Sequence, residues 1–534
     1  MEWFIVPERE RSTSGCREGA SDRRASAAPR PVARSKSVMR FKMIALLGLV
    51  VGLGGCGGGG GAAASGKSTL PEAKRSGSKS TSGGDISKQA AQGYKEALAE
   101  FLKHDKAYDW APATCKASAD AFVSVSKQQQ SDSGKPLPEA LYNAGLSYMR
   151  CGQEEAAVTQ FQDAAKAGQG FHRARAQMAL FEYKKNGDIN RAIQGLEQII
   201  RDAKFQNVEA LVSVAALQME RGNEVEDSDG ANDFERAKKN IQRALAIDDS
   251  FMPAMNQLAI YYMEQARRNA GEKPQGGRRR GGLVVAGQQR TKINRQQLDL
   301  AVLVANRGAK TDPNYAPLYN TYGLVQVELR DYNGAVKSFG RARTLDPNFF
   351  EAHMNYAAVS LSFRGFGEAE KAYRDALRLA PKDYEAHLGL ALALRGQIND
   401  SNGDTYLAES RKHLNECKQI EPDRAEAYYN EAILTQEYEA KGGDSSKSVP
   451  ALKQAVVKYR EFISKAKGQA AYAEAVKRSG ERAKDIEDTI KFIEEGDRLQ
   501  KEQEELDRKA KEAEAKQAAE AGKAPAAEGA APAQ

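Results

Sequence analysis

Residues 61–68 carry the pattern of a glycine, four residues and then Gly-Lys-Ser, whose backbone amides cradle a nucleotide phosphate in other proteins. Such a loop needs a buried strand before it and a helix after it, because these elements hold the amides toward the phosphate. Here a polyglycine run precedes the pattern, and Pro71 and a Ser/Gly-rich run follow it. The setting for nucleotide binding is missing, and we expect no cofactor.

The histidines are the other candidates for chemistry. His353 and His387 lie 34 residues apart, at equivalent places in two copies of a repeat, which favours packing over metal ligation. His104, His172 and His413 have no Cys, Asp or His at ligand spacing. The chain has no Gly-x-Ser-x-Gly motif, and its many Glu–Lys pairs at helical spacing are typical of solvated faces. We therefore predict no metal site, no catalytic residue and no enzymatic activity.

Three cysteines remain besides Cys16 and Cys56. Cys115 and Cys151 fall on neighbouring predicted helix pairs, so an oxidising compartment would permit a disulfide between them. Two free thiols are the alternative. Cys417 falls at a small core position of a repeat, where we expect it simply to be packed.

The elements that position these residues are set by a tandem repeat, residues 316–382. Six positions recur at an offset of 34 residues: Gly323, Tyr332, Ala335, Phe339, Ala342 and Pro347, then Ala357, Phe366, Ala369, Tyr373, Ala376 and Pro381. Small residues let two antiparallel helices approach, aromatic residues fill the space between them, and proline begins the turn to the next pair. This pattern resembles the tetratricopeptide repeat (TPR), which implies stacked helix pairs.

Weaker copies of the pattern extend the array, and we predict an all-α TPR superhelical solenoid of about eight repeats, with an N-terminal helical cap and a long C-terminal helix. The expected segments follow in order. They are a non-native upstream extension at 1–38, a lipoprotein signal peptide at 39–55, a Gly/Ser tether at 56–85, the cap at 86–137, the TPR array at 138–469, the helix at 470–517 and a disordered tail at 518–534. Insertions are expected near 224–233, 267–296, 396–405 and 440–449.

In TPR proteins the first helix of each pair lines a concave groove that binds a partner. By register, the resemblance assigns to this groove Tyr142, Leu146, Met149, Asn256, Ile260, Met263, Asn320, Leu324, Val327, Met354, Leu361, Leu388, Leu392, Tyr429 and Ile433. This set is mostly apolar and contains methionine, which suits a helix or a hydrophobic segment as ligand. The alternative is that tight winding, or the chain's own termini, fills the groove.

A basic loop interrupts the fourth repeat. Between Arg267 and Arg295 stand nine Lys or Arg against one acid, among them Arg278, Arg279, Arg280, Arg290 and Lys292. Such a loop could bind lipid head groups or an acidic polymer, or it could simply be a solvated loop. The formal net charge of +7 falls to about +2 without residues 1–55, and the loop has no interleaved aromatics, so we expect no nucleic acid partner.

Near the N-terminus, Arg40 and Lys42 precede the apolar run 43–53, which is too short for a membrane span of about 20 residues but suits a signal peptide. The run ends Leu53-Gly54-Gly55-Cys56, which resembles a bacterial lipobox, and the alternative is a buried helix that ends at a chance cysteine. The resemblance implies an exported protein that is acylated at Cys56. Gly57 in place of Asp implies the outer membrane, with the folded part in the periplasm.

The signal, tether, repeats and Ala/Glu/Lys-rich tail together are similar to the TPR lipoproteins of the myxobacterial gliding-motility machinery. This resemblance implies a non-enzymatic scaffold that binds proteins of an envelope complex through its concave face. Two alternatives stay open: a pilotin or assembly factor for a secretin or type IV pilus, and an envelope enzyme that acts on peptidoglycan.

Overall fold

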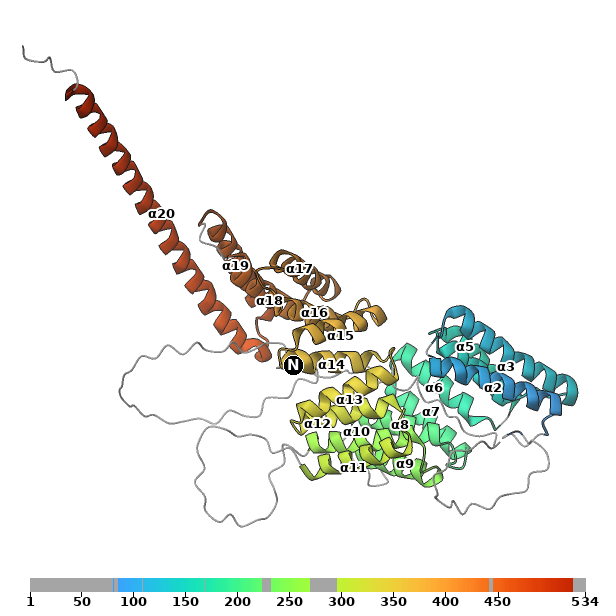
Figure 1. The fold of residues 1–534 in the computed structure, drawn as a ribbon. Helices are drawn as coiled ribbons and strands as arrows, with labels where there is room; N and C mark the ends of the chain where they lie inside the picture. Colours follow the sequence, from blue (N-terminus) through green and yellow to red (C-terminus); the bar gives the residue numbers. More distant parts are fainter. Residues whose placement is uncertain are drawn as a thin grey trace, which may run out of the picture. The chain divides into compact units, whose positions relative to one another are not determined.

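The computed structural model describes residue 80 and residues 85–107, 109–168, 170–222, 232–268, 295–440 and 445–521. Every element in these ranges is a helix, and consecutive helices pack as antiparallel neighbours (Figure 1). The expected all-α fold of tandem helix pairs is confirmed. The chain divides into two compact units, and the boundary between them in the sequence falls between Asn355 and Tyr356 of helix α14.

The N-terminal unit opens with a helix pair that precedes the first repeat, in the region expected to form a cap. Its helices, in order, are α2 (Lys88–Ala107), α3 (Pro112–Ser133), α4 (Pro138–Met149), α5 (Glu154–Ala167), α6 (His172–Asn186), α7 (Ile189–Asp202), α8 (Val208–Arg221), α9 (Asp233–Ile247), α10 (Met252–Arg268), α11 (Arg295–Thr311), α12 (Ala316–Glu328), α13 (Tyr332–Leu345) and the first part of α14 (Phe350–Ser362).

The C-terminal unit continues the same pairing and ends in a long helix. It contains the rest of α14, then α15 (Phe366–Leu379), α16 (Tyr384–Arg395), α17 (Gly403–Ile420), α18 (Glu426–Leu434), the π-helical turn η3 (Thr435–Glu439), α19 (Ser445–Ala466), the 3₁₀ turn η4 (Ala470–Tyr472) and α20 (Ala473–Ala521). The early part of α20 packs on α19 through buried Ile486 and Ile490.

Side-chain caps fix where many of the helices begin. Asp188, Asp331 and Asp383 each precede a helix and accept a hydrogen bond from the backbone N–H three residues later, at 3.0, 3.0 and 2.9 Å. Such a cap satisfies an N–H group that the helix itself leaves unpaired. These Asp residues therefore fix where α7, α13 and α16 begin.

The small and aromatic residues of the repeat pack between the two helices of a pair, as their sizes predict. Ala335 and Ala342 on α13, and Ala369 and Ala376 on α15, have no exposed surface. The ring of Phe339 lies against Gly323 of the partner helix and is also fully buried. Small and aromatic side chains thus interlock between the two helices of one pair, which is the packing that the spacing predicts.

Candidate partner-binding face and its polar clusters

The residues assigned to the concave groove all lie on the first helices of the pairs: α4, α10, α12, α14, α16 and α18. We call the surface that these residues form in each unit the inner face of that unit. First helices also contact one another from pair to pair, as α8 does α10 and α10 does α12 in the N-terminal unit, and α16 does α18 in the C-terminal unit. Side chains on the inner face therefore take part in stacking of the repeats.

Most of the assigned residues are buried: Tyr142, Leu146, Asn256, Ile260, Met263, Asn320, Leu361, Leu388, Leu392, Tyr429 and Ile433. Met149, Leu324, Val327 and Met354 are half-buried. A buried side chain cannot touch a partner unless the helices separate. Any ligand of the inner face in this conformation therefore meets these four apolar side chains and the polar groups beside them.

A polar network links three first helices of the N-terminal unit. The Tyr142 hydroxyl on α4 donates to Oε2 of Glu209 on α8 at 3.1 Å, and Gln177 Nε2 on α6 donates to that hydroxyl at 3.4 Å. The guanidinium of Arg173, also on α6, lies 4.7 Å from the Tyr142 ring centroid and donates to Glu209 through Nε at 3.1 Å. Glu209 is almost fully buried, so the pairing compensates a charge that water cannot solvate.

The charge of Glu209 also shifts the pKa values of Arg173 and Tyr142. Burial lowers the pKa of Arg173, but the charge of Glu209 more than offsets this and raises that pKa above its ordinary value. Burial and Glu209 raise the pKa of Tyr142. Arg173 therefore stays a cation and Tyr142 a neutral hydroxyl, which suits a structural clamp and not a proton-transfer pair.

A second network lies at the start of α16 and α18 in the C-terminal unit. The Arg424 guanidinium lies 3.8 Å from the Tyr384 ring centroid and donates to Glu385 at 2.8 Å and to Glu426 at 3.0 Å. The Tyr472 hydroxyl donates to Glu426 Oε1 at 2.7 Å. Burial raises the pKa of Glu385, whereas hydrogen bonds from Arg424 and Tyr472 hold that of Glu426 below its ordinary value despite burial. The two carboxylates thus share one arginine.

Sequence reasoning did not single out these networks. Their members are ordinary Arg, Glu and Tyr residues of amphipathic helices. Glu209 lies 36 residues after Arg173, and Glu426 lies 2 residues after Arg424. Only the first spacing carries a signal, because it is close to one repeat period and so brings equivalent helices together.

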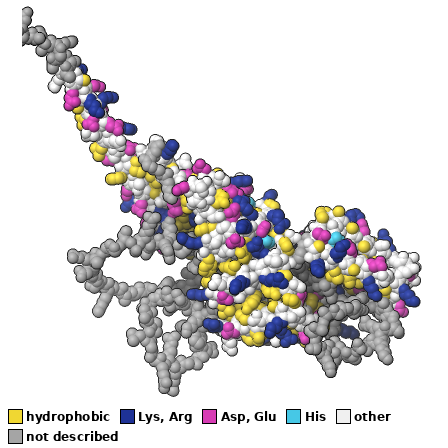
Figure 2. Space-filling model, in the orientation of Figure 1, with side chains coloured by type: hydrophobic (Ala, Val, Ile, Leu, Met, Phe, Trp, Pro, Cys, Tyr) yellow, Lys and Arg dark blue, Asp and Glu magenta, His cyan; other side chains and the backbone are white. Residues whose placement is uncertain are grey.

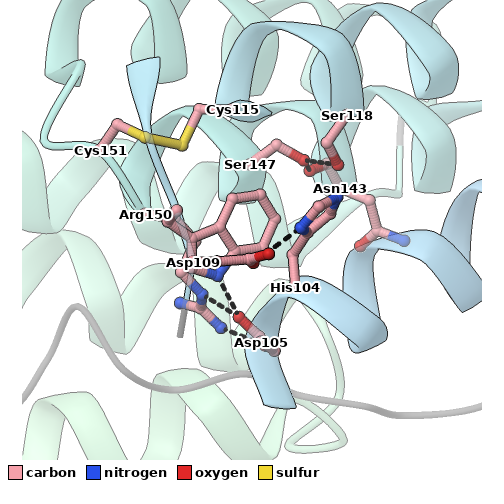
Figure 3. Close-up of a disulfide and its surroundings, with 10 residues drawn as sticks. His104, Asp105, Asp109, Cys115, Ser118, Asn143, Ser147, Arg150 and Cys151 are labelled. Carbon is pink, nitrogen blue, oxygen red and sulfur yellow. Dashed lines mark hydrogen bonds and ion pairs between the residues drawn. A yellow bond between two sulfur atoms is a disulfide. The ribbon is translucent and has the colours of Figure 1, made fainter. Parts of the chain in front are cut away.

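A disulfide joins Cys115 on α3 to Cys151, which follows α4 (Figure 3). Asp105, near the end of α2, accepts hydrogen bonds from Arg150 Nε and Nη2 at 2.6 and 2.8 Å and from Trp110 Nε1 at 2.9 Å (Figure 3). The disulfide and this bidentate pair fasten the first helix pair to the next one. Cys417 is free and buried, and burial raises the pKa of its thiol.

The repeat-spaced histidines lie in equivalent surroundings. Both are buried, and Nε2 of His353 and of His387 donates to the carbonyl oxygens of Pro347 and Pro381, each at 3.0 Å. Nδ1 of His387 lies 2.9 Å from Nδ1 of His413 on α17, so one of these two nitrogens donates to the other. Burial and the adjacent His387 lower the pKa of His413 to about 4. The imidazole of His413 is therefore neutral at pH 7.

No group of three or more potential metal ligands occurs in the part of the chain that the structure describes. In the same residues, none of the helices combines the length and the hydrophobicity of a membrane span. Cys56 and the basic loop with Arg278, Arg279, Arg280, Arg290 and Lys292 lie outside the described residues.

Tandem antiparallel helix pairs define the class as an all-α repeat protein. Residues 138–167, which span α4 and α5, match the family model of the tetratricopeptide repeat. Repeats of this kind present surfaces to other proteins, so the match indicates a protein-interaction scaffold. None of the curated proteins matches this chain.

Similar solved structures include proteins of three bacteria. A thermophilic TPR protein of Thermus thermophilus is 22% identical over 42% of this chain and 99% of its own, with a TM-score of 0.33. A tetratricopeptide repeat protein of Parabacteroides merdae is 13% identical over 58% and 99%, with a TM-score of 0.33. The pilF protein of Pseudomonas aeruginosa is 19% identical over 48% and 96%, with a TM-score of 0.32.

Proposed function

We propose that the protein is a non-enzymatic scaffold of a bacterial envelope complex, held at the outer membrane by acylation of Cys56 and facing the periplasm. The more specific proposal, from the sequence resemblance, is a component of a gliding-motility complex. The lipobox-like Leu53-Gly54-Gly55-Cys56 and the apolar run before it support lipid anchoring.

The single observation that carries the envelope part of the proposal is the Cys115–Cys151 disulfide. Disulfides persist in oxidising compartments such as the periplasm and are rare in a reducing cytosol. The bridge holds α3 to the turn after α4, so it contributes to the fold of the unit that contains the matched repeat. The disulfide therefore favours an oxidising compartment over the cytosol.

The scaffold part of the proposal is supported by the inner face. Leu324 and Val327 on α12 and Met354 on α14 are half-buried and apolar, and Asn355 Nδ2 donates to Asn320 Oδ1 beside them at 2.9 Å. A mixed apolar and amide surface suits an apolar helix or segment of a partner protein. The charged clusters around Arg173 and Arg424 are engaged in ion pairs, which supports a structural role for them over acid–base chemistry.

Anchoring is tested by labelling cells with a palmitate analogue. We expect label on the wild-type protein in the outer-membrane fraction and loss of both label and membrane association in Cys56→Ser. A Cys417→Ser variant is the matched control and should keep the label. Unlabelled wild-type protein in the cytosol would contradict the proposal.

Partner binding is tested by crosslinking and pull-down from the native envelope. Glu substitutions at Leu324 and Val327 put charges on the inner face at half-buried positions, and circular dichroism checks that the variant keeps its helix content. We expect the double variant to lose the co-purifying proteins, while Leu303→Glu on α11, at a side chain that is 65% exposed, keeps them. Recovery of proteins known to act in gliding would favour the motility proposal. Recovery of secretin or pilus proteins would favour the pilotin alternative. Normal gliding of a deletion strain would end the motility proposal.

A further inference from the structure

The outer part of α20 presents an apolar stripe with no cover from the rest of its unit. Ile486 and Ile490 are buried against α19, whereas Phe492, Leu499 and Leu506 are 81%, 54% and 60% exposed. Beyond Ile493, nearly every described side chain of the helix is exposed. Acidic and basic side chains are interspersed along α20, with hydrophobic side chains among them (Figure 2).

The spacing of the stripe is that of a helix that pairs with another helix. Phe492, Leu499 and Leu506 follow one another at intervals of seven residues, and Ala513 continues the series. A seven-residue repeat keeps one seam of a helix facing its partner when two helices supercoil. Four residues after each of these positions stand Gly496, Gln503, Ala510 and Gln517, which complete the seam with small or amide side chains.

The charges beside the seam identify the partner. A charged residue stands immediately before each residue of the second row of the seam. These charged residues are, in order, Glu495, Glu502, Lys509 and Lys516. The set is acidic in its first half and basic in its second. A second copy of the helix that runs antiparallel therefore places Glu495 opposite Lys516 and Glu502 opposite Lys509, and the twofold axis produces each pair twice.

The seam agrees with the same register. It places Ala510 opposite Leu499 and Gln503 opposite Leu506, so each of these layers combines a small or flexible side chain with a leucine. Gly496 lies opposite Ala513, where two small residues let the helices approach closely. A parallel copy would instead bring Glu502 next to Asp507 of the other chain, which is repulsive, and Lys509 next to Glu514, which is attractive, so its charge pairs cancel. The charges therefore favour the antiparallel arrangement.

Existing contacts of the charged residues do not compete strongly. Glu495 pairs with Arg498 at 2.5 Å and Lys509 with Glu505 at 2.8 Å, in both cases within the helix and at exposed side chains. Exposed pairs of this kind are weak, so exchange for pairs between two chains costs little. We propose that residues 492–517 of α20 are a self-association surface, which pairs antiparallel with α20 of a second copy of this chain.

Two charge-reversal variants test the proposal by sedimentation equilibrium of the full chain, with Cys56→Ser in every variant so that acylation plays no part. One carries Glu495→Lys and Glu502→Lys, and the other carries Lys509→Glu and Lys516→Glu. We expect each alone to dimerise at least tenfold more weakly than the parent chain, and an equal mixture to form a heterodimer at least as tight as the parent dimer. The association should weaken as salt is added.

Two further measurements complete the test. Lys substitutions at Leu499 and Leu506 should abolish dimerisation with unchanged helix content, whereas Leu303→Lys on α11 should not. Chains with Gln503→Cys and Leu506→Cys should form a disulfide-linked dimer when mixed, because these positions face each other in the antiparallel register. A crosslink in Gln503→Cys alone, stronger dimerisation of the double Lys charge variant, or a monomeric parent chain at about 100 µM would each overturn the proposal.

Discussion

A side chain on Gly323 would meet the ring of Phe339, because a Cβ atom at that position would lie 2.5 Å from Phe339 Cε1. The two residues are the small and aromatic positions of one repeat, on α12 and α13. Gly145 and Phe161 repeat the relationship on α4 and α5, again with 2.5 Å between the added Cβ and the ring. The close approach of the two helices of a pair thus depends on a missing side chain.

Gly323→Ala should therefore destabilise the N-terminal unit, by about 1 to 3 kcal/mol, because overpacking a filled core forces ring or backbone to move. Gly195→Ala on α7 is the matched control, since nothing lies within 4 Å of a Cβ added there. That change should raise stability by up to about 1 kcal/mol through helix propensity. Urea unfolding followed by circular dichroism measures both, and equal stability of the two variants would contradict this packing.

Arg330→Gly should stabilise the protein. Arg330 joins α12 to α13 with a φ of 63°, in the left-handed region, where Gly152 and Gly187 stand at the equivalent turns with φ of 66° and 70°. A side chain in that conformation costs about 1 kcal/mol, which glycine removes. We expect a higher midpoint of thermal unfolding, and Lys337→Gly in the interior of α13 should lower it instead.

Loss of the Cys115–Cys151 bridge should destabilise the N-terminal unit. The bridge spans 36 residues, a loop for which the entropy of the unfolded chain predicts about 3 to 4 kcal/mol. Cys115→Ala with Cys151→Ala should lower the thermal midpoint by several degrees, and the wild-type protein should gain the mass of two protons on reduction. Labelling of both cysteines in the unreduced, denatured protein would show that no bridge forms.

The C-terminal unit should lose stability in mild acid through His413. Its pKa falls to about 4 in the folded protein, against an ordinary value near 6.5, so the unfolded state binds the proton more readily. The contribution is complete above about pH 6.5 and is lost as the pH falls toward 4. His413→Asn, whose amide can hydrogen-bond to His387, should flatten the pH dependence of the unfolding free energy over this window, and an unchanged slope would contradict this role of His413.

Arg173→Met should destabilise the N-terminal unit by about 3 kcal/mol, because the carboxylate of Glu209 would stay buried without its cation. Adding Glu209→Leu should recover much of the loss, since an apolar pair leaves no uncompensated charge. Chemical denaturation of the two single variants and the double variant forms a double-mutant cycle. Strictly additive losses would show that the two side chains do not interact in the folded protein.

The repeat period allowed much of the fold to be predicted. Six positions at an offset of 34 residues predicted the helix pairs α12–α13 and α14–α15, the turn prolines after them, and the burial of His353 and His387. Spacing was sufficient here because each of these features depends on contacts within one pair or between adjacent pairs, which lie close in the sequence.

The inner face could be assigned by register but not by exposure. Tyr142 and Leu388 occupy groove positions of the repeat, yet both are buried, because first helices of successive pairs press together and enclose them. How tightly pairs stack depends on the side chains of two or three repeats together, and a motif within one repeat does not contain that information.

The sequence by itself determined the helical class, the pairing of the helices and the long C-terminal helix, since all three depend on local periodicity. Only the tertiary structure decided that Arg173 of one pair meets Glu209 of the next, that Arg424 bridges two carboxylates, and that His413 faces His387. These contacts join side chains of different helices. Which side chains come within reach of one another depends on how the helix pairs stack.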